Sequence, residues 1–196
     1  MVELEDTIAL EAITRKCESA NLSEGIIEGG INMEWVTSDH HFGHERIIEL
    51  ERPQFKSLVD MNNYMITQWN KVVASEDTVY HLGDFALGLT NQQMGSLMNT
   101  LNGTIILVRG NHDRMGKQRL LDFGFKDVVS RVEMGRFILT HRPISKDLLG
   151  DRFNIHGHIH SNNIGHDNYI NVSVEQTDYT PVRLDTYIKE TEDEYA

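Results

Sequence analysis

The chain has 196 residues with 30 acidic and 18 basic ones, which gives a formal net charge of −12. Its length suits one domain with a substantial core, and its single cysteine, Cys17, excludes an internal disulfide and a cysteine-based zinc site. The acidic balance argues against a basic groove for a long nucleic acid, although bound divalent cations could reverse the polarity at a site for a small phosphorylated substrate.

Residues 1–32 are expected to form an N-terminal helical extension and a linker. Leu4, Ile8, Ala12 and Ile13 lie near a four-residue spacing that predicts a short amphipathic helix, and three glycines then end it. The extension is either a solvated arm or a packed arm that joins copies of the chain into a homo-oligomer. The chain start lacks the features of a signal peptide, and no stretch has the ~18–20 apolar residues of a membrane span. We therefore expect a cytoplasmic protein without a membrane partner.

The main domain is expected over residues 33–196, and its first half alternates strands with helices. Predicted strands cover residues 34–38, 78–82 and 104–108, from their β-branched and apolar residues. Predicted helices cover residues 45–51, 60–74 and 90–101, with Asp60 as the N-cap of the second. A repeated order of strand, loop and helix is typical of an open α/β sheet whose site lies beyond the carboxyl ends of its strands.

The second half of the domain predicts a second sheet. Residues 128–134 and 136–141 are expected to form a hairpin that turns at Gly135, and residues 153–157 and 169–174 to add two more strands. Residues 184–190 are expected to form a closing helix. The predicted fold class is therefore α/β, with two sheets packed as a sandwich and flanked by helices.

Four clusters of metal-binding side chains follow these strands in one order. Within two of the clusters, pairs of ligands stand two residues apart at a strand end, where strand alternation would point both side chains to the same side. One such cluster is common in surface turns, whereas four in this order argue against chance. The clusters are Asp39-His40-His41, Gly83-Asp84, Gly110-Asn111-His112-Asp113 and Gly157-His158-Ile159-His160, with His141 ahead of the last.

In their types and order, these residues resemble the pattern of the calcineurin-like metallophosphoesterases: Asp-x-His, Gly-Asp, Gly-Asn-His-Asp/Glu, His and Gly-His-x-His. The resemblance covers about residues 33–185 and implies a four-layer αββα fold with two divalent metal ions as cofactors. It implies that one ion is held by Asp39, His41 and His160, the second by Asn111, His141 and His158, and that Asp84 bridges the two.

The resemblance also implies catalytic residues. In such a site two cations clamp the phosphoryl oxygens, and a hydroxide held between them attacks phosphorus in line. His112 would stabilise the developing charge or protonate the leaving oxygen, and Asp113 would fix the orientation of its ring. Oxygen and imidazole ligands without thiolate favour manganese, with iron, zinc or nickel as alternatives, over magnesium.

Several polar residues lie outside the family pattern. His44, at the head of a predicted helix, either binds a substrate phosphate or packs locally, and Arg142 and Arg109 are candidates for contacting substrate oxygens. His40 is expected to be structural, and His81 to pack in the core or to hydrogen-bond a ligand residue. The role of His156 stays open, since strand alternation alone would group it with the two histidines that follow.

The motif variants narrow the expected substrate. Residues 38–44 resemble small bacterial and phage members of the family, many of which cleave phosphodiesters or nucleotides. Residues 83–88 depart from the Gly-Asp-x-x-Asp-Arg-Gly of the protein phosphatases. We expect a metal-dependent phosphohydrolase, a phosphodiesterase acting on a nucleotide-like or other small phosphoester. The alternatives are a phosphomonoesterase, a nuclease for short oligonucleotides, and an inactive binding scaffold of the same fold, against which His112 and the complete ligand set argue.

Overall fold

The computed structural model of the chain describes residues 32–193. The predicted N-terminal helix, and with it the expected role of that segment in self-association, lies outside the described residues. None of the helices in the described part is long and apolar enough to span a bilayer.

Five strands form the first sheet, in the order β4-β3-β2-β1-β9. The edge strand β9 runs antiparallel to its neighbour and the other four run parallel. The strands are β1 (Glu34–Thr37), β2 (Thr78–His81), β3 (Thr104–Val108), β4 (Asp127–Val129) and β9 (Val182–Arg183). Since β1, β2 and β3 are parallel, the loops that follow them meet at one edge of the sheet.

Four strands form the second sheet, in the order β5-β6-β7-β8. The first two pair as the predicted hairpin around Gly135, and the last three run parallel. The strands are β5 (Val132–Met134), β6 (Phe137–Thr140), β7 (Phe153–His156) and β8 (Tyr169–Asn171). A bridge between Ser38 and Ser173 joins the end of β1 to the segment after β8, so the two sheets meet near their carboxyl ends.

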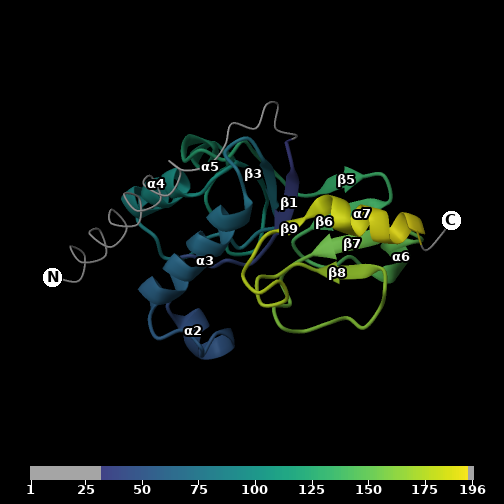
Figure 1. Cartoon of the computed structure of the whole chain (residues 1–196), viewed down its shortest axis with the longest axis horizontal. Helices are drawn as coiled ribbons and strands as arrows, with labels where there is room; N and C mark the ends of the chain where they lie inside the picture. Colours follow the sequence, from purple (N-terminus) through teal and green to yellow (C-terminus); the bar gives the residue numbers. More distant parts are fainter. Residues whose placement is uncertain (1–31, 194–196) are drawn as a thin grey trace.

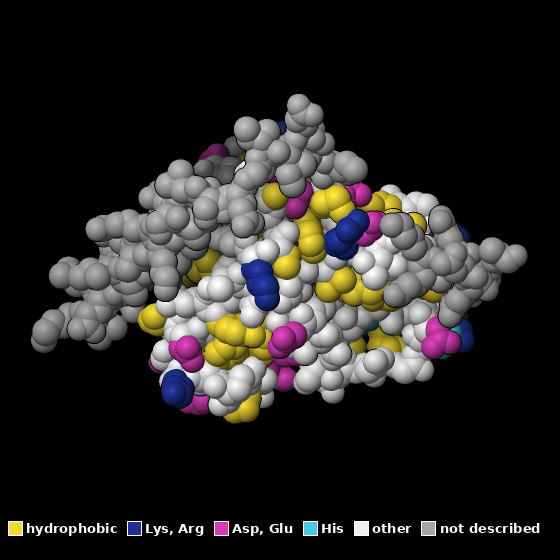
Figure 2. Space-filling model, viewed as in Figure 1, with side chains coloured by type: hydrophobic (Ala, Val, Ile, Leu, Met, Phe, Trp, Pro, Cys, Tyr) yellow, Lys and Arg dark blue, Asp and Glu magenta, His cyan; other side chains and the backbone are white. Residues whose placement is uncertain are grey.

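Six helices flank the sheets in the described part of the chain. Most of them lie on one side of the molecule, beside the first sheet. The last two in chain order lie on the opposite side, where the last helix also contacts β1 and β9 of the first sheet (Figure 1). The helices are α2 (Arg46–Glu51), α3 (Leu58–Val72), α4 (Asn91–Thr100), α5 (Lys117–Asp122), α6 (Lys146–Leu149) and α7 (Leu184–Asp193). The predicted fold class, two sheets flanked by helices, is confirmed. On the face shown in Figure 2, the Lys and Arg side chains stand apart from one another among acidic and apolar ones.

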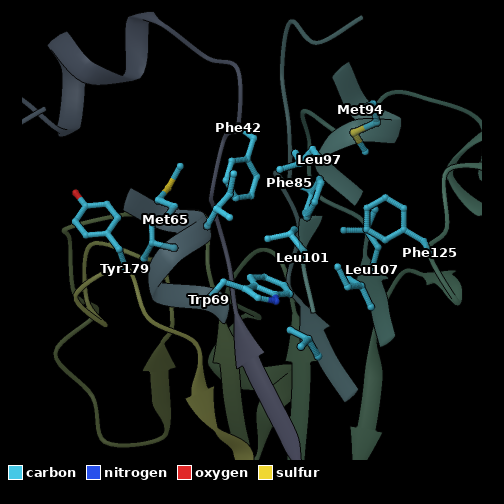
Figure 3. Packing of buried hydrophobic residues seen from close by; sticks show 14 of the residues in the cluster. Phe42, Met65, Trp69, Phe85, Met94, Leu97, Leu101, Leu107, Phe125 and Tyr179 are labelled. Atoms are coloured by element: carbon cyan, nitrogen blue, oxygen red, sulfur yellow. The ribbon is translucent and has the colours of Figure 1, made fainter. Parts of the chain in front are cut away.

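Two apolar cores hold these layers together. Alternate residues of the first sheet face opposite ways, so Val79 packs beneath the helices whereas Tyr80 faces the second sheet. Trp69 of α3 is fully buried in the helical core, among Phe42 and Phe85 from the loops after β1 and β2 (Figure 3). The loops that carry the predicted ligands are therefore anchored in the core directly beside them.

Three predicted elements need correction. Residues 128–134 form two strands in different sheets, β4 and β5, because the chain crosses between the sheets at Ser130 and Arg131. The N-cap of α3 is Ser57, whose hydroxyl accepts a hydrogen bond from the backbone N–H of Asp60, so Asp60 lies in the first turn. The last predicted strand ends at Asn171, and the short elements α5, α6 and β9 were not predicted.

Candidate metal centre

The predicted ligands lie in the loops that follow β1, β2, β3, β6 and β7. The fold brings side chains from these loops into two groups, and within each group one potential ligand atom per residue lies within 4.8 Å of the others. The first group is Asp39, His41 and His160, and the second group is Asp84, His141 and His158. The two sheets contribute to both groups, so the site exists only when the sandwich is assembled.

The backbone turns sharply at these ligands. Asp39, His41, Asp84, His158 and His160 all have positive φ values, between 48° and 72°. The left-handed region costs an ordinary L-residue about 1–2 kcal/mol, so the surrounding contacts must hold each bend in place. The prediction that strand alternation aligns both ligand pairs was wrong in its reason, because the pairs lie in bends beyond the strand ends. Asp39 and His41 still fall in one group, as expected, whereas His158 and His160 belong to different groups.

Three glycines allow the ligand loops to approach one another. A Cβ on Gly83 would lie 2.5 Å from the backbone nitrogen of Gly110, and a Cβ on Gly110 would lie 2.3 Å from a carboxylate oxygen of Asp84. A Cβ on Gly157 would lie 2.2 Å from Oδ2 of Asp39. Since such contacts are sterically forbidden, glycine at these positions is what lets the loops from separate strands converge.

The first group contains buried polar atoms without partners. Oδ2 of Asp39 accepts hydrogen bonds from the backbone N–H of His158 at 2.8 Å and from the hydroxyl of Ser173 at 3.0 Å. Its Oδ1, and both ring nitrogens of His41, are buried without a hydrogen-bond partner among the described residues. Buried polar atoms of this kind are rare and costly. A cation beside these atoms would satisfy the carboxylate and one imidazole nitrogen, so the residues fit a metal ion.

In the second group, a hydrogen bond and short distances between ligand atoms suit the binding of a metal ion. Nδ1 of His141 donates to the carbonyl of Leu82 at 2.8 Å, so its Nε2 carries the free lone pair. Oδ1 of Asn111 lies 2.9 Å from that Nε2, which places the predicted amide ligand with this group. Oδ2 of Asp84 lies 3.5 Å from Nε2 of His141 and 3.6 Å from Nε2 of His41. Asp84 therefore stands between the two groups, where a bridging ligand is expected.

Burial controls the protonation of the ligands. Burial lowers the pKa of His41 to about 2 and lowers that of His158, so both rings are neutral, as a metal ligand must be. Burial also raises the pKa of Asp39, whose carboxylate gains from a neighbouring positive charge. For His160, burial lowers the pKa, but the hydrogen bond to Glu175 together with the negative charges of Glu175 and Asp39 outweighs burial, and the net shift is upward.

Asp113 does not orient His112, contrary to the prediction. Its Oδ2 accepts hydrogen bonds from the backbone N–H groups of Asp84 and Gly110, both at 2.8 Å, and its Oδ1 accepts one from that of Phe85 at 3.1 Å. With three backbone donors, its carboxylate ties the loop after β3 to the loop after β2. Asp113 thus positions Asp84.

The predicted catalytic and substrate-binding residues surround the two groups. The backbone N–H of His112 donates to Oδ1 of Asp84 at 2.8 Å, and its side chain, 33% exposed, has its Nε2 3.9 Å from Oδ2 of the same carboxylate. The ring of His44 lies 5.5 Å from that of His41, between ring centroids. The exposed Arg142 lies with Nη2 3.5 Å from Oδ1 of Asn111. All three side chains lie beside residues of the two groups or beside Asn111.

Arg109, in contrast, is held by its own loop. Its guanidinium donates to the backbone carbonyls of Asp113 and Met115, both at 2.6 Å, and so braces the segment that follows β3. The guanidinium of Arg109 therefore holds this loop, whereas a contact with substrate oxygens was the role considered for it.

The three histidines of unassigned role are buried. Nδ1 of His40 and Nε2 of His81 are 3.0 Å apart, and the backbone N–H of Gly83 donates to Nδ1 of His81 at 3.2 Å. This chain of contacts ties the Asp39 loop to the Asp84 loop. It confirms a structural role for His40 and the core-packing role for His81, whose hydrogen-bond partners are not predicted ligands. His156 belongs to neither ligand group. Its Nδ1 lies 2.9 Å from the carbonyl of Gly157, and its ring packs against that of Tyr169.

Three residues at the site were missed by sequence reasoning. Arg52 and Glu175 form a buried ion pair beside the first group, and Ser173 contacts Asp39. In the sequence, an arginine after a short helix and a glutamate after a strand are typical of exposed positions. No pattern in the chain connects two residues that are 123 positions apart.

A comparison with known families now identifies the class of protein. Residues 35–193 match the family model of the calcineurin-like phosphoesterases. The chain belongs to this family, whose activity is metal-dependent hydrolysis of phosphoesters. The resemblance inferred from the motifs is thereby confirmed.

Relatives share all or part of this domain. The chain is 38% identical over 168 residues to an uncharacterized protein of Methanocaldococcus jannaschii, an alignment that covers 79% of this chain and 89% of that protein. It is 36% identical over 81 residues to the gene 66 protein of Mycobacterium phage L5, of which the match spans 39%. The crystal structure of a protein of unknown function from Aquifex aeolicus is similar with a TM-score of 0.63 and 29% identity, and the match covers 81% of this chain and 99% of that one.

Proposed function

We propose that this protein is a phosphodiesterase that acts on a nucleotide-like or other small phosphoester with two divalent metal ions, manganese being favoured. The observation that carries the proposal is the position of Asp84, whose Oδ2 lies 3.6 Å from a ligand atom of the first group and 3.5 Å from one of the second group. A carboxylate shared in this way, together with the unpaired atoms of Asp39 and His41, supports two adjacent cations.

The donor set would divide between the ions as the resemblance implies. Asp39, His41 and His160 would hold one ion, Asn111, His141 and His158 the other, and Asp84 both. When bound, the ions supply positive charge that polarises the phosphoryl group and lowers the pKa of water. The mixed oxygen and imidazole ligands suit manganese, iron or zinc better than magnesium.

The chain itself would orient the substrate and supply a proton. His112 is partly exposed beside Asp84, and its imidazole can protonate a leaving oxygen. Arg142, on the Asn111 side, can donate to a phosphoryl oxygen. Burial lowers the pKa of His44, so its imidazole is neutral. A neutral imidazole can donate one hydrogen bond to a phosphoryl oxygen.

A small substrate is supported by the charge of the molecule. The net charge of −12 and the separated basic residues on the face in Figure 2 offer little to a long polyanion. The proposed partner is therefore a small phosphoester.

Hydrolysis of bis-p-nitrophenyl phosphate beside p-nitrophenyl phosphate tests the proposal. Metal-stripped protein with added Mn²⁺ is expected to cleave the diester with the higher kcat/KM, and His112→Ala to lower kcat by about 10²–10⁴-fold. His166→Ala, a change at an exposed histidine outside the ligand set, serves as the control and should be neutral. A preference for the monoester would indicate a phosphomonoesterase, and no turnover of either ester by the Mn²⁺-loaded protein would favour a binding scaffold.

A further inference from the structure

Arg52 is a buried cation beside the first group. Its residue is 0% exposed although it follows the surface helix α2. Its Nη1 donates to the carbonyl of His40 at 2.7 Å, its Nη2 donates to the carbonyl of Asp39, and its Nε donates to Oε1 of Glu175 at 2.9 Å. One guanidinium thus holds the backbone of the Asp39 loop and the carboxylate of Glu175.

Glu175 continues this contact to a predicted metal ligand. The same Oε1 lies 3.0 Å from Nδ1 of His160. A proton on Nδ1 that is donated to a carboxylate leaves Nε2 with the free lone pair and makes that nitrogen a stronger ligand. The corresponding contact in the second group is weaker, because Nδ1 of His141 donates to the neutral carbonyl of Leu82.

The contacts of Arg52 and Glu175 connect the two loops that carry the ligands of the first group. Asp39 follows a strand of the first sheet, whereas His160 follows a strand of the second. A buried ion pair is poor evidence of stabilisation, because the loss of hydration offsets most of the attraction between the charges. The pair contacts two residues of one ligand group. It is therefore better explained by a role in positioning those residues than by a contribution to the stability of the fold.

We propose that Glu175 and Arg52 are positioning residues for the cation held by the first group. Glu175 fixes the tautomer and orientation of His160, and Arg52 fixes both Glu175 and the backbone of the Asp39 loop. The inference rests on the proposed two-ion function. It adds that the affinity of the protein for one of the two ions, but not for the other, depends on Glu175 and Arg52.

Titration of metal-stripped protein with Mn²⁺, followed by calorimetry, measures each binding step. Glu175→Gln keeps the shape of the side chain and removes its charge, and it is expected to weaken one step by about 10–100-fold while the other stays within twofold. The matched control is Glu34→Gln, which changes a carboxylate that accepts a hydrogen bond from Tyr80 at a distance from the site. In a His158→Ala background, which removes a ligand of the second group, the remaining step should still be weakened by Glu175→Gln.

A second variant separates positioning from folding. Glu175→Gln alone leaves the buried Arg52 without its counter-charge and lowers the melting temperature of the metal-free protein. The double variant Arg52→Gln/Glu175→Gln removes both charges, so it should recover part of the melting temperature and still bind the affected Mn²⁺ weakly.

The outcomes distinguish this inference from the proposed function. Two Mn²⁺ steps in the wild type that Glu175→Gln leaves unchanged, or weakens equally, would overturn the positioning role alone. A double variant with wild-type affinity would do the same. A wild-type protein that binds no Mn²⁺ would overturn the two-ion proposal together with this inference.

Discussion

At the scale of single residues, Asp84 is the centre of the proposed site. Its Oδ2 faces ligand nitrogens of both groups, while its Oδ1 accepts the backbone N–H of His112. One carboxylate thus links both proposed ions to the proposed proton donor.

Asp84→Asn should weaken both Mn²⁺ binding steps, since the amide offers one neutral oxygen in place of a shared charge. The loss should exceed the roughly 10–100-fold effect expected for a residue that only supports a ligand. Calorimetry with Asp122→Asn, a change in α5, as the control measures it. If Asp84→Asn weakened a single step, Asp84 would belong to one ion and would not bridge.

Asp113 provides a residue-scale prediction about stability. Asp113→Ala leaves three backbone N–H groups of the Asp84 and Gly110 loops without their acceptor, which we expect to cost about 3 kcal/mol in the free energy of unfolding. Urea denaturation of the metal-free protein measures this cost. A loss of activity without a loss of stability would restore the prediction that Asp113 acts on the ring of His112.

At the scale of elements, the ligand loops depend on close packing. Gly157→Ala would place a Cβ 2.0 Å from Oγ of Ser38 and 2.2 Å from Oδ2 of Asp39, so the β1 and β7 loops would have to separate. We expect a destabilisation of about 1–3 kcal/mol and a weakened first group. Denaturation and Mn²⁺ titration measure both effects.

Gly95→Ala is the matched control for this substitution. Gly95 lies within α4, and nothing lies within 4 Å of the Cβ that the substitution would add. The change should stabilise the protein by about 0.5–1 kcal/mol, because alanine favours helix more than glycine does. Equal effects of the two substitutions would contradict the role given to the loop contact.

The elements also explain what the sequence could predict. The strands β1, β2 and β3 were predictable because each is a short apolar run followed by polar residues, and the helix α3 because its apolar residues recur on one face. The break between β4 and β5 was not predictable, since residues 128–134 contain no glycine or proline to mark the crossing between the sheets.

The ligand types could be predicted, but their arrangement could not. The positive φ values at Asp39 and His160 arise from tertiary contacts, which strand periodicity does not encode. The burial of Arg52 and Glu175 likewise depends on α2 meeting the segment after β8, so their charges suggested an exposed position.

At the scale of the whole molecule, buried histidines make stability depend on pH. Burial lowers the pKa of His81 to about 3 and of His41 to about 2, and it lowers that of His40 well below 6.5. The unfolded chain takes up protons at these side chains below pH 6.5, whereas the folded chain does not. The free energy of unfolding is therefore highest above pH 6.5. It decreases as the pH falls from 6.5 toward the pKa values that these histidines have in the folded protein.

Each of these groups should lower the free energy of unfolding of the metal-free protein by about 1.4 kcal/mol per pH unit once the pH is well below 6.5. Urea denaturation at pH 7.5, 6.5 and 5.5 measures the slope, and His166→Ala, at an exposed position, should leave it unchanged. A stability that does not change over this range would show that the buried rings do not resist protonation.

Each ligand group combines loops from both sheets, so the two ions would bind only to the assembled molecule. Anomalous diffraction from crystals of the protein loaded with Mn²⁺ would locate the ions. Two peaks about 3.5–4 Å apart are expected. One should lie among Asp39, His41 and His160, the other among Asn111, His141 and His158, with Asp84 between them. A single peak, or peaks away from these side chains, would contradict the two-ion proposal.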